Sequence, residues 1–201
     1  MIRNAPPNPP SGSTAYSSLG LNALLRFLED GHVYTILDLG PVLSANVEFW
    51  SRIPCRLHVE DFYSRYRERS SGSSEDAAES TFQDILCFGD GTRFDMVLAW
   101  DLFNYLDLNE IGSLIRRLAL WCERGALLFA LVSSQVTIPA EPRRFRILDT
   151  ERLLVETGTM ETRQNPRHQP RDLAKILSGF RVSSSFLLRN GVQEYVFIYG
   201  E

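Results

Sequence analysis

Three acidic residues, Asp38, Glu60 and Asp84, each lie at the end of a segment that could form a β-strand. If the strands belong to one open α/β sheet, their carboxyl ends meet at the edge where ligands bind in such sheets. A carboxylate accepts two hydrogen bonds at once, so it can hold donor groups of a ligand. Each residue alone has a simpler explanation: Asp38 and Asp84 could cap a turn or a loop, and Glu60 could be a solvated edge residue. Their common position favours a ligand site.

Other residues with possible chemistry give weaker indications. His168 could act as a base, although a surface-loop histidine is the simpler interpretation. Three cysteines stand at spacings that fit neither a zinc motif nor a disulfide framework, and we interpret them as buried residues in a reducing compartment: Cys55, Cys87 and Cys122. We therefore expect no metal site.

Arginines are concentrated between the last predicted core strand and the C-terminal hairpin. They are Arg143, Arg144, Arg146, Arg152, Arg163, Arg167 and Arg171. An anionic ligand is one interpretation of this segment. Acidic residues are interspersed among the arginines, which slightly favours a solvated cover instead.

The elements that must position these residues alternate along the chain. Helices are predicted near 21–28, 44–53, 61–69, 111–121 and 171–177, and strands near 33–39, 56–60, 81–83, 94–100, 126–132, 180–188 and 192–199. Alternation predicts a parallel sheet with helices on both faces, and Asn190-Gly191 predicts a hairpin between the last two strands. The sequence therefore predicts an α/β fold: a doubly wound, mostly parallel seven-stranded sheet with a C-terminal antiparallel hairpin.

The length of 201 residues fits one domain with a full core. Residues 1–14 are rich in proline and serine and are expected to form a loose tail, leaving 15–201 as the domain. The tail lacks the apolar stretch of a secretory signal, and no apolar run is long enough to span a membrane. We expect a cytoplasmic protein with no membrane partner, and the net charge of −4 argues against nucleic acid. The oligomeric state stays open.

Several strings resemble class I S-adenosylmethionine-dependent methyltransferases over roughly residues 30 to 200. They are DILCFGDGTRFDMV at 84–97, similar to the stretch that leads into the family's fourth strand; WDLFNYL at 100–106, similar to the loop after it; RGALL at 124–128, similar to the start of its fifth strand; and GFRV at 179–182, similar to the start of its terminal hairpin. The resemblance implies a Rossmann-like methyltransferase fold, S-adenosylmethionine as cofactor, and methyl transfer.

The cofactor loop departs from the family's D-x-G-x-G-x-G pattern. It reads DLGPVLS at 38–44, so Asp38 and Gly40 fit while Val42 and Ser44 replace glycines. Valine is a poor substitute if that position needs a positive φ. Serine is milder, because Ser44 can cap the following helix.

The resemblance also implies roles for the acids. Glu60, or Asp61 as the alternative, would hold the ribose hydroxyls, and Asp84 would meet the adenine amino group. With Asp38 and Gly40, these residues form the expected cofactor site.

The expected catalytic position follows the fourth strand, where Asp101, Asn104 and Tyr105 are the candidates for a base. The N/D-P-P-Y/F signature of amide and base N-methylation is absent there, so a small-molecule acceptor is expected. The alternative is a catalytically inactive domain that binds a protein partner, which Val42 and Ser44 favour. A nucleotide-binding dehydrogenase would need a second glycine in this loop.

Overall fold

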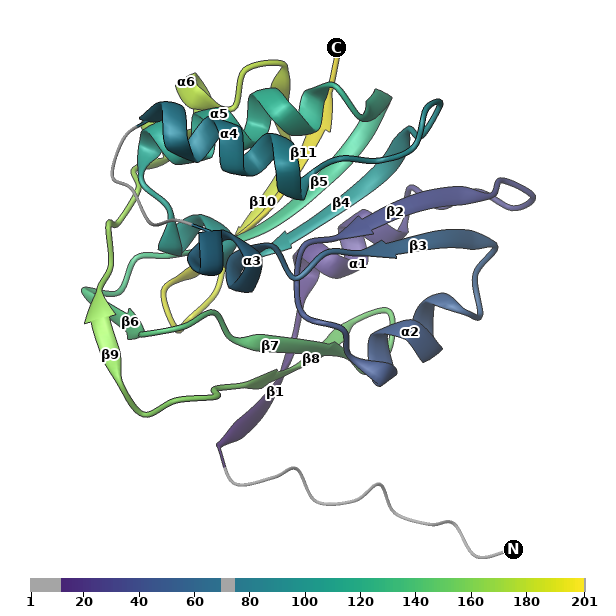
Figure 1. The fold of residues 1–201 in the computed structure, drawn as a ribbon. Helices are drawn as coiled ribbons and strands as arrows, with labels where there is room; N and C mark the ends of the chain where they lie inside the picture. Colours follow the sequence, from purple (N-terminus) through teal and green to yellow (C-terminus); the bar gives the residue numbers. More distant parts are fainter. Residues whose placement is uncertain (1–11, 70–74, 201) are drawn as a thin grey trace, which may run out of the picture.

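The structure, a computed structural model, describes residues 12–69 and 75–200 (Figure 1). Its strands are β1 (Ser13–Ser17), β2 (Tyr34–Asp38), β3 (Cys55–Val59), β4 (Phe94–Trp100), β5 (Cys122–Ser133), β6 (Thr137–Pro139), β7 (Arg144–Ile147), β8 (Arg152–Glu156), β9 (Thr162–Gln164), β10 (Phe180–Leu187) and β11 (Val192–Tyr199). Its helices are α1 (Leu19–Leu25), α2 (Ser44–Trp50), α3 (Phe62–Arg69), α4 (Glu75–Ile85), α5 (Leu108–Ala119) and α6 (Pro170–Ile176), with a 3-10 helix, η1, at Leu102–Tyr105.

The main sheet joins six strands of the described chain in the order β10-β11-β5-β4-β2-β3. Strands β3, β2, β4 and β5 run parallel, whereas β11 runs antiparallel to both β5 and β10. The predicted α/β fold class and its antiparallel C-terminal hairpin are confirmed.

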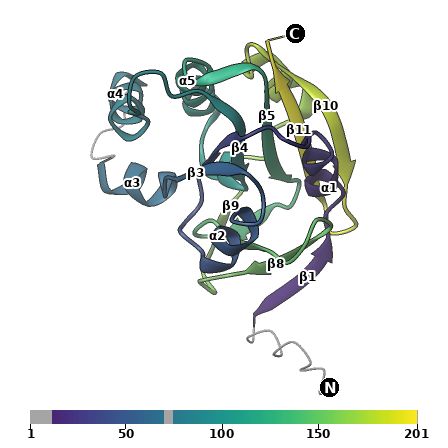
Figure 2. The ribbon, with the colours of Figure 1, turned by 90° about the vertical axis from the view of Figure 1, so that its right-hand side faces the viewer.

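Helices cover both faces of this sheet (Figure 2). On one face the core under α3, α4, α5 and α6 contains Phe82 and Leu114. On the other face the core under α1, α2, β7 and β8 contains Leu24 and Leu153. The two cores hold the sheet between them, as the predicted doubly wound arrangement requires.

Helix α5 shows how the sequence specifies such an element. Its apolar residues recur at helical spacing and all are fully buried: Ile111, Leu114, Ile115 and Leu118. A capping box closes its N-terminus, because Asp107 accepts a hydrogen bond from the Glu110 amide while Glu110 accepts one from the Asp107 amide.

The strand order reverses at β2, and this reversal defines where a site can form. The chain passes from β2 to β3 on one side and later to β4 on the other side of β2. The loops after β2 and β4 therefore diverge, which opens a crevice at the carboxyl edge of the sheet. Asp38 ends β2, Glu60 follows β3 and Asp101 follows β4.

One predicted strand is a helix in the structure. The segment 81–83 lies within α4, so the main sheet has six strands instead of seven. Phe82, Ile85 and Leu86 are buried at helical spacing, and α4 packs on α5. Burial of that apolar stripe favours the helix over an edge strand.

Three further predictions need correction. The segment 133–170, for which no helix or strand was predicted, contains the short strands β6 to β9. The expected boundary after residue 14 falls inside β1, which pairs with β8 through Ser13 and Thr14, while residues 1–11 lie outside the described part. Ser44 is the first residue of α2 and not its N-cap; Leu43 holds that position without a side-chain hydrogen bond.

A buried carboxylate joins the N-terminal elements to the sheet. Glu194 of β11 is fully buried and accepts hydrogen bonds from the Ser18 hydroxyl and the Gly20 amide, both at 2.7 Å, and from the Tyr16 side chain. A Cβ on Gly20 would lie 2.8 Å from the Cβ of Glu194, so only glycine lets α1 approach β11 this closely. The contact fixes β1 beside the carboxyl edge of the sheet.

Candidate functional site

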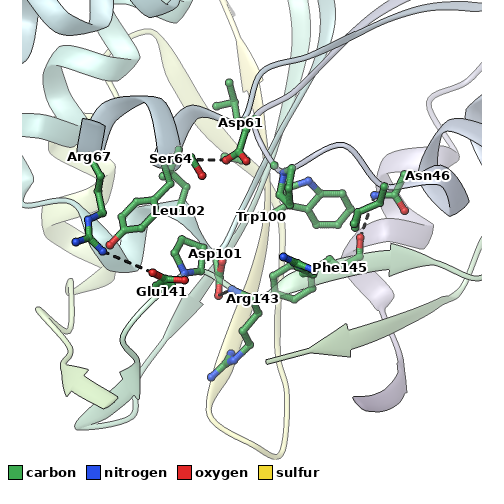
Figure 3. A pocket seen from close by; sticks show the side chains of 18 of the residues that line it. Asn46, Asp61, Ser64, Arg67, Trp100, Asp101, Leu102, Glu141, Arg143 and Phe145 are labelled. Carbon is green, nitrogen blue, oxygen red and sulfur yellow. Dashed lines mark hydrogen bonds and ion pairs between the residues drawn. The ribbon is translucent and has the colours of Figure 1, made fainter. Parts of the chain in front are cut away.

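A cavity of about 440 Å³, here called the first cavity, lies at the reversal point of the sheet (Figure 3). Its walls contain Gly40 from the loop after β2, Asp61 from the loop after β3, Asp101 after β4, and Arg143 just before β7. Its volume falls in the range of small-molecule sites, about 300–1,000 Å³. Because the cavity joins segments from across the sequence at the ligand-binding edge, it is the candidate functional site.

Asp38 is not among the residues that line this cavity. Its side chain is 2% exposed, and its Oδ1 accepts hydrogen bonds from Trp100 Nε1 at 2.6 Å and from the Gly40 amide at 2.9 Å. Burial raises the pKa of Asp38 to about 6, and the hydrogen bonds from Trp100 and Gly40 oppose that rise. Asp38 therefore holds the loop and the indole in place.

Gly40 is required by the close approach of Trp100. A Cβ on Gly40 would lie 2.9 Å from Trp100 Cδ1. The indole in turn stacks on Phe145, with ring planes 3° apart and centroids 5.4 Å apart. The indole of Trp100 therefore fills the space where a side chain at position 40 would stand.

The backbone at Trp100 is unusual. Its φ is 49°, and the pairing of β4 with β5 shifts between Leu98 and Trp100. Such irregularities re-aim a side chain and occur often beside active sites. A positive φ at a non-glycine residue costs about 1–3 kcal/mol, so the surrounding contacts must stabilise this conformation.

Val42 and Ser44 cause no corresponding backbone strain. Neither is among the residues with positive φ. The Val42 side chain is 69% exposed and is not among those that line the first cavity. The loss of two glycines therefore does not distort this loop.

The acids expected to hold the cofactor are only partly brought together. Glu60 forms an ion pair with Arg65 and does not line the first cavity. Asp61, the alternative, does line it, and its Oδ1 accepts a hydrogen bond from the Ser64 amide at 3.4 Å. Asp84 is exposed on α4, 3.6 Å from Arg69, and lies outside the cavity.

Asp101 lies between two cavities. The second, of about 330 Å³ and here called the second cavity, is lined from β1, β5, β8 and β11 as well as by Asp101. The side chain is 3% exposed; its Oδ2 accepts a hydrogen bond from the Arg143 amide at 3.3 Å, and its Oδ1 has no partner in the described chain. Burial raises the pKa of Asp101 to about 7, which the Arg143 guanidinium opposes.

Asn104 has a structural role. Its Nδ2 donates to the carbonyl oxygens of Leu131 and Asp101, both at 2.9 Å, and its Oδ1 accepts from the Ser133 amide at 2.8 Å. These bonds attach η1 to the end of β5, and the side chain borders the second cavity.

Tyr105 and His168 also hold loops together. The Tyr105 hydroxyl donates to the Glu141 carbonyl at 2.8 Å, and burial raises the pKa of Tyr105 above its usual value. His168 Nε2 lies 3.0 Å and 2.9 Å from the carbonyls of Phe103 and Leu106. Carbonyls only accept, so Nε2 carries a proton and donates. Of the three predicted candidates for a base, Asp101 alone lines the first cavity.

Several of the arginines in segment 143–171 pair with acids. Arg146 contacts Glu156 at 3.2 Å and Arg152 contacts Asp149 at 2.7 Å. Arg143 is half-buried at the first cavity. These ion pairs agree better with a solvated cover than with a site for an anionic ligand.

Three aromatic residues line the first cavity, Tyr63, Trp100 and Phe145, and none of them was predicted as a site residue. Trp100 ends the strand predicted at 94–100, Tyr63 lies in the helix predicted at 61–69, and Phe145 lies where no helix or strand was predicted. The one available signal was the position of Trp100, directly before Asp101. Its rotation toward Gly40 depends on the irregular strand pairing, which no local pattern encodes.

Within residues 12–69 and 75–200, no group of three or more His, Cys, Asp or Glu side chains could hold a metal ion. No helix in the same residues is long and apolar enough to cross a membrane.

No protein-family model matches the chain, and no curated protein matches it. Many solved structures are similar to it, and three of them are described here in turn. The glycopeptide N-methyltransferase MtfA in complex with S-adenosylmethionine is 16% identical, with 90% of this chain and 92% of that chain covered and a TM-score of 0.49. The magnesium protoporphyrin IX methyltransferase of Synechocystis PCC 6803 is 16% identical, with 90% and 76% covered and a TM-score of 0.48. An S-adenosylmethionine-dependent methyltransferase from Clostridium acetobutylicum is 10% identical, with 84% of each chain covered and a TM-score of 0.47. The chain is similar to these methyltransferases at low sequence identity.

Proposed function

We propose that this chain is an S-adenosylmethionine-dependent methyltransferase that acts on a small molecule. The observation that carries the proposal is the first cavity. Three of the segments to which the resemblance assigns a role border it: the loop at Gly40, the segment after β3 at Asp61 and the loop at Asp101. A cytoplasmic location is part of the same proposal.

The first cavity suits this cofactor in size and in polarity. Its 440 Å³ can accept a ligand of nucleoside size. Asp61 offers a carboxylate for ribose hydroxyls, while Leu39 and Leu102 offer apolar surface. Bound S-adenosylmethionine would supply an activated methyl group. The chain would supply binding, orientation of the acceptor and exclusion of water.

We expect Asp61→Asn to weaken binding of S-adenosylhomocysteine, the demethylated product. The substitution removes a charged hydrogen-bond acceptor from the cavity wall but keeps a side chain that can accept the Ser64 amide bond. The expected loss is about tenfold or more, the effect of one hydrogen bond to a charged group. Isothermal titration calorimetry of the parent and the variant measures it.

Glu60→Gln and Val42→Gly are the matched controls. Glu60, which pairs with Arg65, and the exposed Val42 do not line the first cavity, so each substitution should leave the affinity within about twofold of the parent. A large loss of affinity in Glu60→Gln, with no loss in Asp61→Asn, would show that Glu60 and not Asp61 contacts the ribose.

A second function, a binding domain without catalysis, is favoured by one observation. The indole of Trp100 packs against Gly40 and donates a hydrogen bond to the Asp38 carboxylate. A ligand therefore cannot use the space beside Gly40 that the indole fills. If the parent fails to bind S-adenosylhomocysteine in the same calorimetric titration, this second function replaces the first, and the ligand would be a protein partner.

A further inference from the structure

Two cavities share one wall at the carboxyl edge of the sheet. The first and the second cavity have three lining residues in common, Asp101, Arg143 and Phe145. The second cavity is also lined by the N-terminal strand β1, through Tyr16, and by the strand β8, through Val155. A ligand in one cavity and a ligand in the other would therefore meet at these three side chains.

Asp101 has an unused hydrogen-bonding atom at this wall. Its side chain is 3% exposed, and Oδ1 is buried without a hydrogen-bond partner in the described residues, whereas Oδ2 accepts the Arg143 amide. An unpartnered buried carboxyl oxygen is costly and rare in folded proteins. A donor group on a ligand would satisfy it.

The rest of the second cavity is uncharged. Of the described residues that line it, only Asp101 and Arg143 carry formal charge. The others are apolar or neutral polar, for example Leu131, Val155 and Ser133. A charged ligand would have to leave water for a wall that already contains one charge of each sign. The lining thus fits an uncharged, partly apolar molecule.

We propose that the second cavity binds the methyl acceptor, an uncharged hydroxyl compound whose O–H group donates to Oδ1 of Asp101. This proposal rests on the proposed function of the first cavity. A hydroxyl is a weak nucleophile and gains from a base, whereas a strongly nucleophilic acceptor would not need the buried carboxylate. Asp101 is then the catalytic residue.

The transfer exchanges one bond to the methyl carbon for another. The acceptor oxygen forms a bond to the methyl carbon, the bond from that carbon to the donor's sulfur breaks with its electron pair left on sulfur, and the hydroxyl proton passes to Asp101. The groups that act on Asp101 are Arg143, which stabilises its ionised form, and Tyr16 and Tyr105, which lie close enough to feel its charge.

The test uses phenol and anisole as probes of the full chain, with ligand-observed NMR titrations at about pH 8, above the pKa of Asp101. Phenol has a donor hydroxyl, and anisole carries a methyl group in its place. Phenol should bind the parent about tenfold more tightly than anisole, as one hydrogen bond to a carboxylate predicts. Asp101→Asn should reduce that preference. Equal affinity of the two probes for the parent would overturn the role of Asp101.

Two cavity-filling variants locate the probe. Val155 lines only the second cavity and Ser64 only the first. Val155→Trp should abolish phenol binding and leave S-adenosylhomocysteine binding intact, and Ser64→Trp should do the reverse. Circular dichroism confirms that each variant is folded, and Thr14→Trp fills the second cavity from β1 if Val155→Trp does not fold.

The outcomes separate this proposal from the proposed function. Phenol binding that Val155→Trp leaves unchanged overturns the acceptor site, even where S-adenosylhomocysteine binds normally. Phenol binding that Val155→Trp abolishes, in a chain that does not bind S-adenosylhomocysteine, supports a hydroxyl-binding cavity and overturns the methyltransferase function.

Discussion

Replacing Glu194 by alanine is expected to lower the unfolding temperature by roughly 6–12 °C. Its carboxylate is fully buried and accepts hydrogen bonds from Ser18, Gly20 and Tyr16. Alanine would leave these donors unsatisfied at a cost of about 3 kcal/mol in the free energy of unfolding. For a chain of this length, 1 kcal/mol corresponds to roughly 2–4 °C. Differential scanning calorimetry measures the change.

Glu123→Ala is the matched control, because Glu123 is an exposed acid on β5 of the same sheet. It should change the unfolding temperature little. Since Glu194 also accepts from Tyr16 of β1, its loss should reduce the amide exchange protection of β1 and α1 more than that of β4. Equal unfolding temperatures for the Glu194 and Glu123 variants would show that the buried carboxylate does not hold the N-terminal elements.

The inner strands of the sheet were predictable from the sequence because they form nearly continuous apolar runs. The apolar run at 94–100 matches β4 residue for residue, and the run at 192–199 matches β11. Such runs leave few alternatives, and the Asn190-Gly191 turn fixes the direction of the last strand. Residues two apart in a strand share a face, so Glu194 lies on the same face of β11 as Val196, where α1 packs. A lone acid in an apolar strand gives no indication of which groups donate to it.

Helix α4 shows where the local pattern was outweighed. Phe82, Ile85 and Leu86 stand at helical spacing, yet the string that begins at Asp84 resembles a strand end in methyltransferases. In this chain those apolar residues pack on α5. The cofactor role predicted for Asp84 depended on that strand, and the structure instead exposes Asp84 beside Arg69.

The candidate site was predictable in position but not in detail. Acids after parallel strands meet at one edge by topology alone, so Asp38, Asp61 and Asp101 were placed near one another by the strand order. Which of them borders a cavity depends on Trp100 and Phe145, whose stacking joins β4 to a distant segment. Contacts of that kind depend on three-dimensional packing and leave no periodic signal.

Asp101→Asn is expected to stabilise the chain at pH 8 and to have little effect at about pH 4. Burial raises the pKa of Asp101 to about 7 in the folded state, against about 3.9 in the unfolded chain. Between these values the folded state binds more protons than the unfolded state, so stability falls as pH rises. Asparagine removes the ionisation and therefore this loss of stability, which amounts to about 4 kcal/mol at pH 8, at about 1.4 kcal/mol for each unit of difference between the two pKa values.

Denaturant unfolding at both pH values measures the effect, with Asp90→Asn as the control because Asp90 is exposed in a turn. Burial also raises the pKa of Asp38, to about 6, so its ionisation lowers the stability of parent and variant by the same amount. The difference in stability between the two proteins therefore isolates the effect of Asp101. Equal stabilities of parent and variant at pH 8 would mean that water or the Arg143 guanidinium compensates the buried charge. A difference that grows with pH would instead identify Asp101 as a carboxyl group whose proton is lost near neutral pH. That property is what a base for a hydroxyl acceptor requires.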